Sequence, residues 1–269
     1  MIIQDRHFSG FYWLFTIYFV HIFNNGFIHD ENQKLWVHGF TPNFIYSMTF
    51  ATVPKIPSND LEKSKLMISF YSWLSSYRHS VILVFGNESD FNFSAEMLRF
   101  FDDSFREESN NGHVIQFEKQ IQTNQYGIPL INDWFMQGFQ LSSTDFITFI
   151  NSDIILTADW GFKIPLIYKR LGESAIIING RINCDFDSNK IMQLAQKFTK
   201  NGAKYFDFSK ELNYILQGAP AYKDIGDAID IFTFSKNSPF HPKIIPPFLM
   251  GFVRWDNWLA GYLNIHYDT

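Results

Sequence analysis

Short apolar runs alternate along the chain with longer segments whose apolar residues recur at helical spacing. The apolar, β-branched runs predict buried strands at residues 43–54, 80–86, 113–117, 146–150, 174–179 and 229–234. The longer segments predict helices at residues 61–77, 93–105, 133–141, 159–169, 191–200 and 255–263. Strand–helix–strand units of this length favour an α/β fold with a mixed, mostly parallel sheet flanked by helices, Rossmann-like in type.

The first part of the chain follows a different pattern. Residues 8–28 carry no charged side chain when His21 is neutral, and residues 11–20 are strongly apolar. A run of this kind is nearly long enough to span a bilayer. We expect residues 1–42 to form an N-terminal apolar segment that acts as a signal anchor, followed by a stem. This would make the chain a single-pass membrane protein of the secretory pathway, in the Golgi or the endoplasmic reticulum.

Two other readings of the same run stay open, a cleaved signal peptide and an aromatic element packed on the core. The folded domain is expected over residues 43–269.

Composition narrows the class of protein. Hydrophobic residues make up 46% of the chain and charged residues 18%, which is typical of a globular protein. The net charge of −5 gives no basic surface for nucleic acid. The single cysteine, Cys184, excludes an internal disulfide framework and a cysteine-rich zinc site. The 31 Phe, 12 Tyr and 7 Trp could fill a core or stack on sugars or bases, and their number favours neither.

The most informative stretch follows the apolar run at residues 146–150. That run ends abruptly in Asn151-Ser152-Asp153. Ligands of α/β sheets bind where strands end, and a carboxylate there can hold a divalent cation that in turn holds a diphosphate. Place and composition match the DxD motif of glycosyltransferases, with Asn151 in the first position. The alternative is a strand that ends in an ordinary Asx-turn.

Two further residues are candidates for binding a nucleotide-sugar. Asn132 precedes a predicted helix together with Asp133, so the pair could bind a ligand or cap that helix. Arg181 follows a predicted strand and could pair with a phosphate in a bidentate manner. Its alternative is a surface ion pair with Asp185 or Asp187.

Two carboxylates are candidates for catalysis. Asp230 alternates with apolar neighbours in a predicted strand, so it points away from them and needs a partner. Asp256 lies between Trp255 and Trp258 at the start of a predicted helix. Aromatic walls exclude water and raise the basicity of a carboxylate, which suits a general base. The alternative is that Asp256 caps the helix while both tryptophans belong to the core.

Several phrases occur in the same order as in a known family. They are Phe50-Ala-Thr-Val-Pro-Lys55, Ser72-Trp-Leu74, Val81-Ile-Leu-Val-Phe-Gly86, Gly127-Ile-Pro-Leu-Ile-Asn-Asp133, Phe149-Ile-Asn-Ser-Asp-Ile-Ile-Leu156, Ile229-Asp-Ile-Phe-Thr-Phe234, Ile245-Pro-Pro-Phe248 and Trp255-Asp-Asn-Trp258. Over residues 43–269 the chain resembles an uncharacterised family of GT-A glycosyltransferases, nucleotide-diphospho-sugar transferases whose metal motif reads Asn-x-Asp.

The resemblance implies a transferase that moves a sugar from a nucleotide-sugar donor to a hydroxyl acceptor on a glycan, a protein or a small molecule. It implies a divalent metal, Mn²⁺ or Mg²⁺, held through Asp153, with Asp256 on the acceptor side. In an inverting reaction Asp256 would take the acceptor proton. In a retaining reaction Asp256 or Asp230 would face the sugar.

The chain departs from the family pattern in two places. The segment at Arg181 reads Gly-Arg-Ile-Asn-Cys where an aromatic pair is usual. The chain stops at His266-Tyr-Asp-Thr269, where family members continue into a His-bearing tail, so we expect that this tail is missing.

Two other functions compete with the transferase. A sugar-nucleotide pyrophosphorylase would need a glycine-rich phosphate loop after the first strand, and residues 52–57 contain no glycine. A catalytically inactive binding or scaffold protein on the same fold is the alternative from another class, and the shortened end favours it.

Overall fold

The structure is a computed structural model, and it describes residues 46–77, 79–91, 93, 95–105, 114–156, 160–172, 174–181, 183–201, 211, 221–222, 229–252 and 254–267. The chain divides into two units, Met1–Phe44 and Ile45–Thr269, and the described residues belong to the second. The expected signal anchor and stem lie outside the described residues. Within the described part, no helix is both long enough and apolar enough to cross a membrane.

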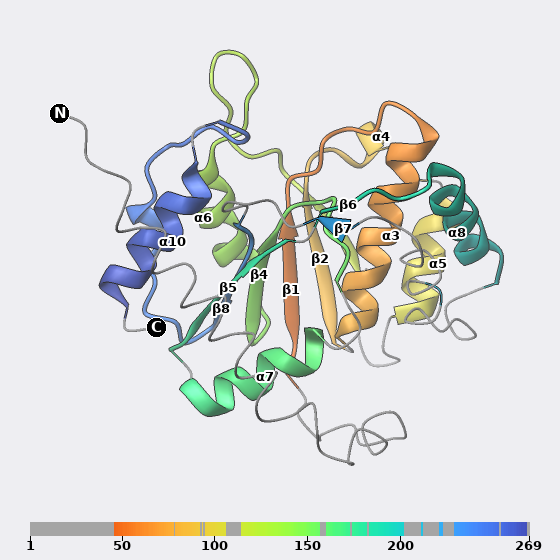
Figure 1. Ribbon diagram of the computed structural model, residues 1–269. Helices are drawn as coiled ribbons and strands as arrows, with labels where there is room; N and C mark the ends of the chain where they lie inside the picture. The colour runs from red at the N-terminus through yellow and green to blue at the C-terminus, as the bar shows by residue number, and fades with distance from the viewer. Residues whose placement is uncertain are drawn as a thin grey trace, which may run out of the picture. The chain divides into compact units, whose positions relative to one another are not determined.

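A six-stranded sheet forms the centre of the second unit (Figure 1). Its strands are β1 (Met48–Thr52), β2 (Ser80–Phe85), β3 (Ile115–Glu118), β4 (Phe146–Ile150), β5 (Ile176–Gly180) and β8 (Ile229–Ser235). They lie in the order β3-β2-β1-β4-β8-β5. The first four are parallel to one another, and β8 is antiparallel to β4 and to β5 on either side of it. The sheet is therefore mixed and mostly parallel.

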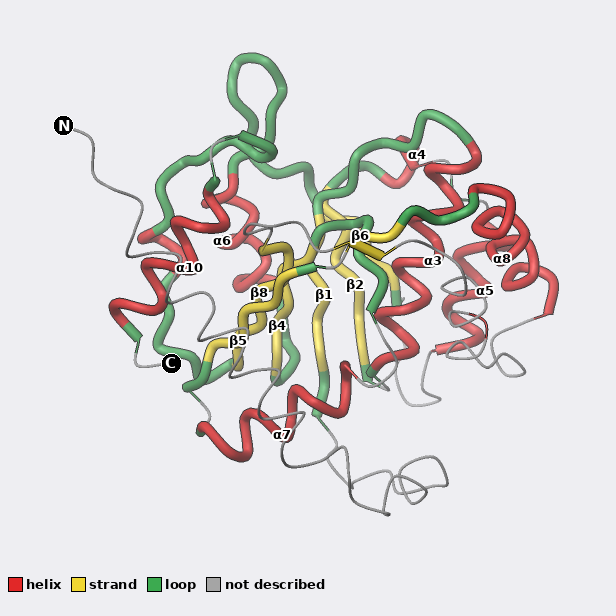
Figure 2. The backbone as a smooth tube through the Cα atoms, viewed as in Figure 1, coloured by secondary structure: helices red, strands yellow, loops and turns green. Residues whose placement is uncertain are grey.

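Helices cover both faces of this sheet. They are α3 (Asp60–Ser76), α4 (Glu88–Phe91), α5 (Ala95–Phe105), α6 (Ile131–Leu141), α7 (Trp160–Leu171), α8 (Ser188–Asn201) and α10 (Trp255–His266). Helices α3, α5, α7 and α8 share one hydrophobic core with β1, β2 and β4. Helices α6 and α10 cover the other face, where their aromatic rings meet those of β4 and β8. Figure 2 shows the helices on either side of the strands.

The predicted α/β architecture is confirmed, and each predicted strand and helix has a counterpart. The first predicted strand, 43–54, was too long, because the described strand covers only Met48–Thr52. The elements without a prediction are short: α4, the β6–β7 pair (Asn183–Cys184 with Ala221–Tyr222) and the 3₁₀ turn η2 (Pro242–Ile244). Segments of this length carry too few apolar positions to show a period.

The connections leave the middle of the sheet in opposite directions. From β1 the chain passes through α3 to β2 on one side, and from β4 it passes through α7 to β5 on the other. Because β1 and β4 are neighbours, a topological switch point lies between their carboxyl ends. Ligands of open α/β sheets bind in the crevice at such a point. The residues that follow β4, which begin at Asn151, lie there.

Close packing of α6 on β4 gives a first testable prediction. A Cβ on Gly138 would lie 2.5 Å from Phe149 Cε1. The Phe149 ring is fully buried and stacks on Phe135 with a centroid separation of 3.9 Å, so it has little room to move. We expect Gly138→Ala to lower the free energy of unfolding by about 1–3 kcal/mol through overpacking, measured by urea denaturation.

A helical glycine in open space provides the matched control. A Cβ on Gly261 in α10 would have nothing within 4 Å. Gly261→Ala should therefore raise the free energy of unfolding by up to about 1 kcal/mol through helix propensity alone. Equal effects of the two substitutions would contradict the close α6–β4 contact.

Candidate active site

A tight turn follows β4 at the switch point. The backbone N–H of Ile154 donates to the carbonyl of Asn151 at 3.2 Å, which closes a turn over Asn151, Ser152 and Asp153. Asn151 is half-buried, whereas Asp153 is exposed at the far side of the turn. The turn thus presents the Asp153 carboxylate to solvent at the carboxyl edge of the sheet.

Helix α3 holds the chain directly after this turn. The Trp73 indole N–H donates to the carbonyl of Ile154 at 2.8 Å, and the backbone N–H of Leu156 donates to Ser72 Oγ at 3.0 Å. Trp73 is fully buried and Ser72 nearly so. The position of Asp153 therefore depends on a helix about 80 residues earlier in the chain.

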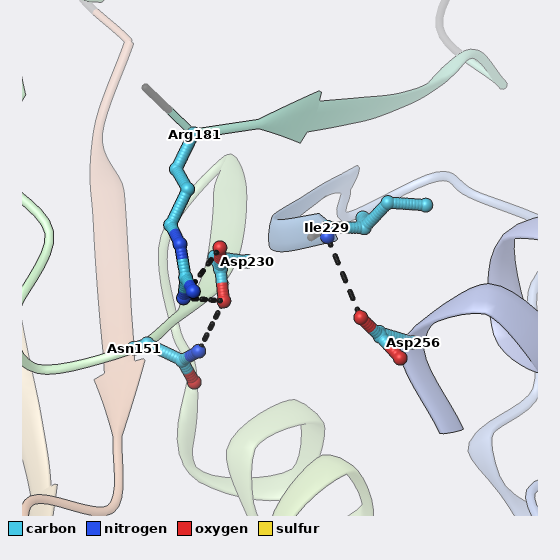
Figure 3. Close-up of polar contacts among 5 residues, drawn as sticks. All are labelled: Asn151, Arg181, Ile229, Asp230 and Asp256. Carbon is cyan, nitrogen blue, oxygen red and sulfur yellow. Dashed lines mark hydrogen bonds and ion pairs between the residues drawn. The ribbon is translucent and has the colours of Figure 1, made fainter. Parts of the chain in front are cut away.

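Asp230 lies opposite Asn151 at the amino end of β8. Residues 147, 149 and 151 share one face of β4, and residues 230, 232 and 234 share the same face of β8, because side chains alternate along strands and Phe149 pairs with Phe232. The Asn151 backbone N–H donates to the Asp230 carbonyl at 3.3 Å. The Asn151 side-chain amide donates to Asp230 Oδ1 at 2.5 Å (Figure 3).

Arg181 reaches the same carboxylate from the end of β5. Its Nη1 lies 3.3 Å from Asp230 Oδ1 and 3.2 Å from Oδ2. The alternative of a surface ion pair with Asp185 or Asp187 is therefore wrong, because the guanidinium pairs with the buried Asp230 instead. A register shift at the end of β5, between Asn179 and Gly180, immediately precedes this arginine.

The Asp230 carboxylate is a perturbed acid. Only 7% of the residue is exposed. Burial raises the pKa of Asp230 above its ordinary value, the Arg181 guanidinium lowers it, and the Asp153 carboxylate raises it again. The Asn151 hydrogen bond lowers this pKa and the Asp256 carboxylate raises it, both to a smaller extent. Asp153 and Asp256 therefore both lie close enough to Asp230 to influence its carboxylate.

Asp256 approaches from α10. It lies in the first turn of that helix, and its Oδ2 accepts from the Ile229 backbone N–H at 3.4 Å (Figure 3). Trp255 is buried against Trp134 and Phe232, so this tryptophan belongs to the core. Trp258 is only partly buried. One of the two predicted aromatic walls is therefore core, and the other borders solvent.

Asn132 and Asp133 do not cap α6. The helix begins at Ile131, its N-cap is Leu130, and no side chain caps it. Asp133 is buried, and its Oδ2 accepts from the Gln122 backbone N–H at 2.6 Å and from Gln137 Nε2 at 2.7 Å. In the described part of the chain, no hydrogen bond or ion pair joins Asn132 to Asp230 or Arg181.

The residues at this edge suit a divalent cation that is completed by a ligand. Among the described residues, no group of three or more His, Cys, Asp or Glu side chains could hold a metal. Mg²⁺ in phosphate-transfer sites is bound through one or two carboxylates together with substrate phosphates. Asp153 supplies an exposed carboxylate, and the Asn151 amide oxygen points away from Asp230 (Figure 3). This partial set of oxygen ligands fits such a metal.

No protein-family model matches the chain, and no curated protein is significantly similar to it.

The raised pKa of Asp230 makes a prediction about stability and pH. Because the native state holds this proton more tightly than the unfolded state, the group makes the free energy of unfolding fall as pH rises through the raised pKa. Asp230→Asn keeps an acceptor for Asn151 and removes the charge. Relative to the native protein, this variant should gain stability as pH rises above the ordinary pKa of a carboxyl group, about 4, measured by thermal unfolding.

The exposed Asp185 gives the control. Asp185→Asn should show no such gain with pH. A relative loss of stability for Asp230→Asn as pH rises would mean that the Arg181 ion pair outweighs the cost of burial.

Proposed function

We propose that the chain is a glycosyltransferase of the GT-A type that uses a nucleotide-sugar donor and a divalent metal, Mn²⁺ or Mg²⁺. The observation that carries this proposal is the place of Asp153. Its exposed carboxylate follows β4 at the topological switch point of the sheet, close enough to Asp230, the partner of Arg181, to influence that carboxylate. The ordered phrases of the sequence support the same function. We therefore propose an enzyme rather than an inactive binding protein.

Charge at this edge supports a diphosphate bound through a metal. A diphosphate alone would be repelled by the carboxylates of Asp153, Asp230 and Asp256. A divalent cation on Asp153 and Asn151 reverses the local sign, and when bound it would stabilise the charge that develops on the leaving nucleotide. Arg181 adds a guanidinium that can pair with a phosphate oxygen. The Arg181 side chain lies against Asp230.

The two candidate catalytic acids differ in their surroundings. Asp230 is buried, and its oxygens already accept from Asn151 and face Arg181. Asp256 is less buried, and its hydrogen bond to Ile229 is long at 3.4 Å. We therefore assign the acceptor proton in an inverting reaction to Asp256. Asp230 would position Arg181 and Asn151, and in a retaining reaction either carboxylate could face the sugar.

Calorimetry of nucleotide binding tests the metal site. The full chain is titrated with UDP and with GDP, each with and without Mn²⁺. We expect one nucleotide to bind in a Mn²⁺-dependent manner. Asp153→Asn should weaken this binding at least about a hundredfold, because a metal–carboxylate contact is lost. The exposed Asp103 in α5 offers a matched control, and Asp103→Asn should bind like the native protein.

Two results would contradict the assignment. Mn²⁺-dependent binding that survives in Asp153→Asn would place the metal on another carboxylate. No nucleotide binding under any condition would leave the inactive binding or scaffold protein as the function.

A further inference from the structure

A small hairpin rises between β3 and α6 (residues 122–130, here called the Tyr126 hairpin). Thr123 bridges to Pro129, and the Leu130 N–H donates to the Gln122 carbonyl at 2.9 Å. At the tip, the Asn124 side chain accepts from the N–H groups of Tyr126 and Ile128 at 2.9 and 3.0 Å. Asn at the first and Gly at the fourth position of a β-turn are preferred residues, and Gly127 has φ +77°.

The hairpin is fixed at its base as well as at its tip. The buried Asp133 carboxylate accepts from the Gln122 N–H at 2.6 Å, which ties the first arm to α6. A charge-assisted hydrogen bond of this kind is among the stronger ones in proteins. The hairpin therefore holds its tip in one place.

This rigid tip exposes an aromatic ring. Tyr126 is 77% exposed, the most of any large hydrophobic residue in the described part of the chain. A protein gains no stability from a ring that is left in water. The turn nevertheless holds this ring in a fixed place, which indicates that the ring contacts a ligand.

A second turn stands beside the hairpin and also exposes an aromatic ring. The Met250 N–H donates to the Pro129 carbonyl at 2.9 Å, and Leu249 bridges to Leu130. The Phe252 N–H donates back to the Leu249 carbonyl at 3.2 Å, and Phe252 is 54% exposed. Figure 1 shows both segments above α6 and α10, at the end of the sheet to which the parallel strands point.

The chemistry of this pair of turns is uncharged and rich in amides. No charged residue occurs from 120 to 132 or from 244 to 253. Around the tyrosine, the side chains of Gln120, Gln122 and Gln125 are exposed. An aromatic face packs on an apolar surface, and amides both donate and accept hydrogen bonds. A sugar ring offers C–H faces to the first and hydroxyls to the second.

We propose that the Tyr126 hairpin and the turn at residues 249–252 form a binding site for a neutral oligosaccharide, with Tyr126 stacked on a sugar ring. The role of this site as the acceptor site of the transferase rests on the proposed function. The site lies on the α6 and α10 side of the sheet edge, and Asp256 lies in the first turn of α10. A neutral glycan bound there would extend from the Tyr126 hairpin toward Asp256.

Saturation-transfer NMR with the full chain tests the site. The probes are a panel of neutral hexasaccharides of glucose, mannose, xylose and N-acetylglucosamine, and nucleotide binding is measured in parallel by calorimetry. At least one hexasaccharide should bind the native protein. Tyr126→Ala should raise its Kd about tenfold, whereas Tyr126→Phe should keep binding because the ring remains. Nucleotide binding should not change in either variant.

An exposed residue elsewhere provides the control. Ile265 is 73% exposed in the last turn of α10, and Ile265→Ala should bind the sugar like the native protein. Sugar binding without any nucleotide binding would support the site and contradict the transferase. Nucleotide binding without any sugar binding, or equal sugar binding by Tyr126→Ala, would overturn the site and leave the transferase standing.

Two further measurements exclude other occupants of the surface. If Tyr126→Ala changes the native mass in light scattering, the surface joins two copies of the chain and the proposal is wrong. The second measurement is sedimentation with phosphatidylcholine vesicles. If the native protein sediments with them and the double variant Tyr126→Ala/Phe252→Ala does not, the surface contacts a membrane and the proposal is likewise wrong.

Discussion

A buried carboxylate at the carboxyl edge of the sheet is the constraint on which the candidate site depends. Burying the Asp230 charge is costly unless partners compensate for it. The compensation comes from Asn151 after β4 and Arg181 after β5. Three strands are thereby joined at one point. The same contacts orient the amide and the guanidinium next to the turn that presents Asp153. They offset only part of the cost of burying the charge, because the pKa of Asp230 stays raised.

The antiparallel strand β8 makes it possible for these side chains to meet. In an all-parallel sheet only carboxyl ends would meet at this edge, whereas β8 brings its amino end there. Asp230 is the second residue of that strand, and the N–H of its first residue, Ile229, donates to the Asp256 carboxylate of α10. Residues that lie about 80 positions apart in the chain thus meet. The connections after β1 and β4 leave in opposite directions, and this places the crevice of the switch point at the same edge.

Much of the fold could be predicted from the sequence because its strands are continuous apolar runs and its helices are long enough to show a period. The need of Asp230 for a partner was also predictable from its alternation with isoleucines. Its partners were not, because they follow from strand order and register, which depend on contacts distant in sequence. The interpretation of Asp133 as a helix cap failed for a related reason: its carboxylate serves a hairpin that precedes the helix. The role of Ser72 and Trp73 in holding the Asp153 turn had no local signal.

The central claim is that a cation on Asp153 holds a diphosphate at this edge. Anomalous diffraction at the manganese edge, from crystals of the chain grown with Mn²⁺ and UDP or GDP, tests it most directly. The account predicts a manganese peak in contact with the Asp153 carboxylate, with the diphosphate between the metal and Arg181. A peak on other residues, or a nucleotide bound away from the carboxyl ends of β1 and β4, would contradict it.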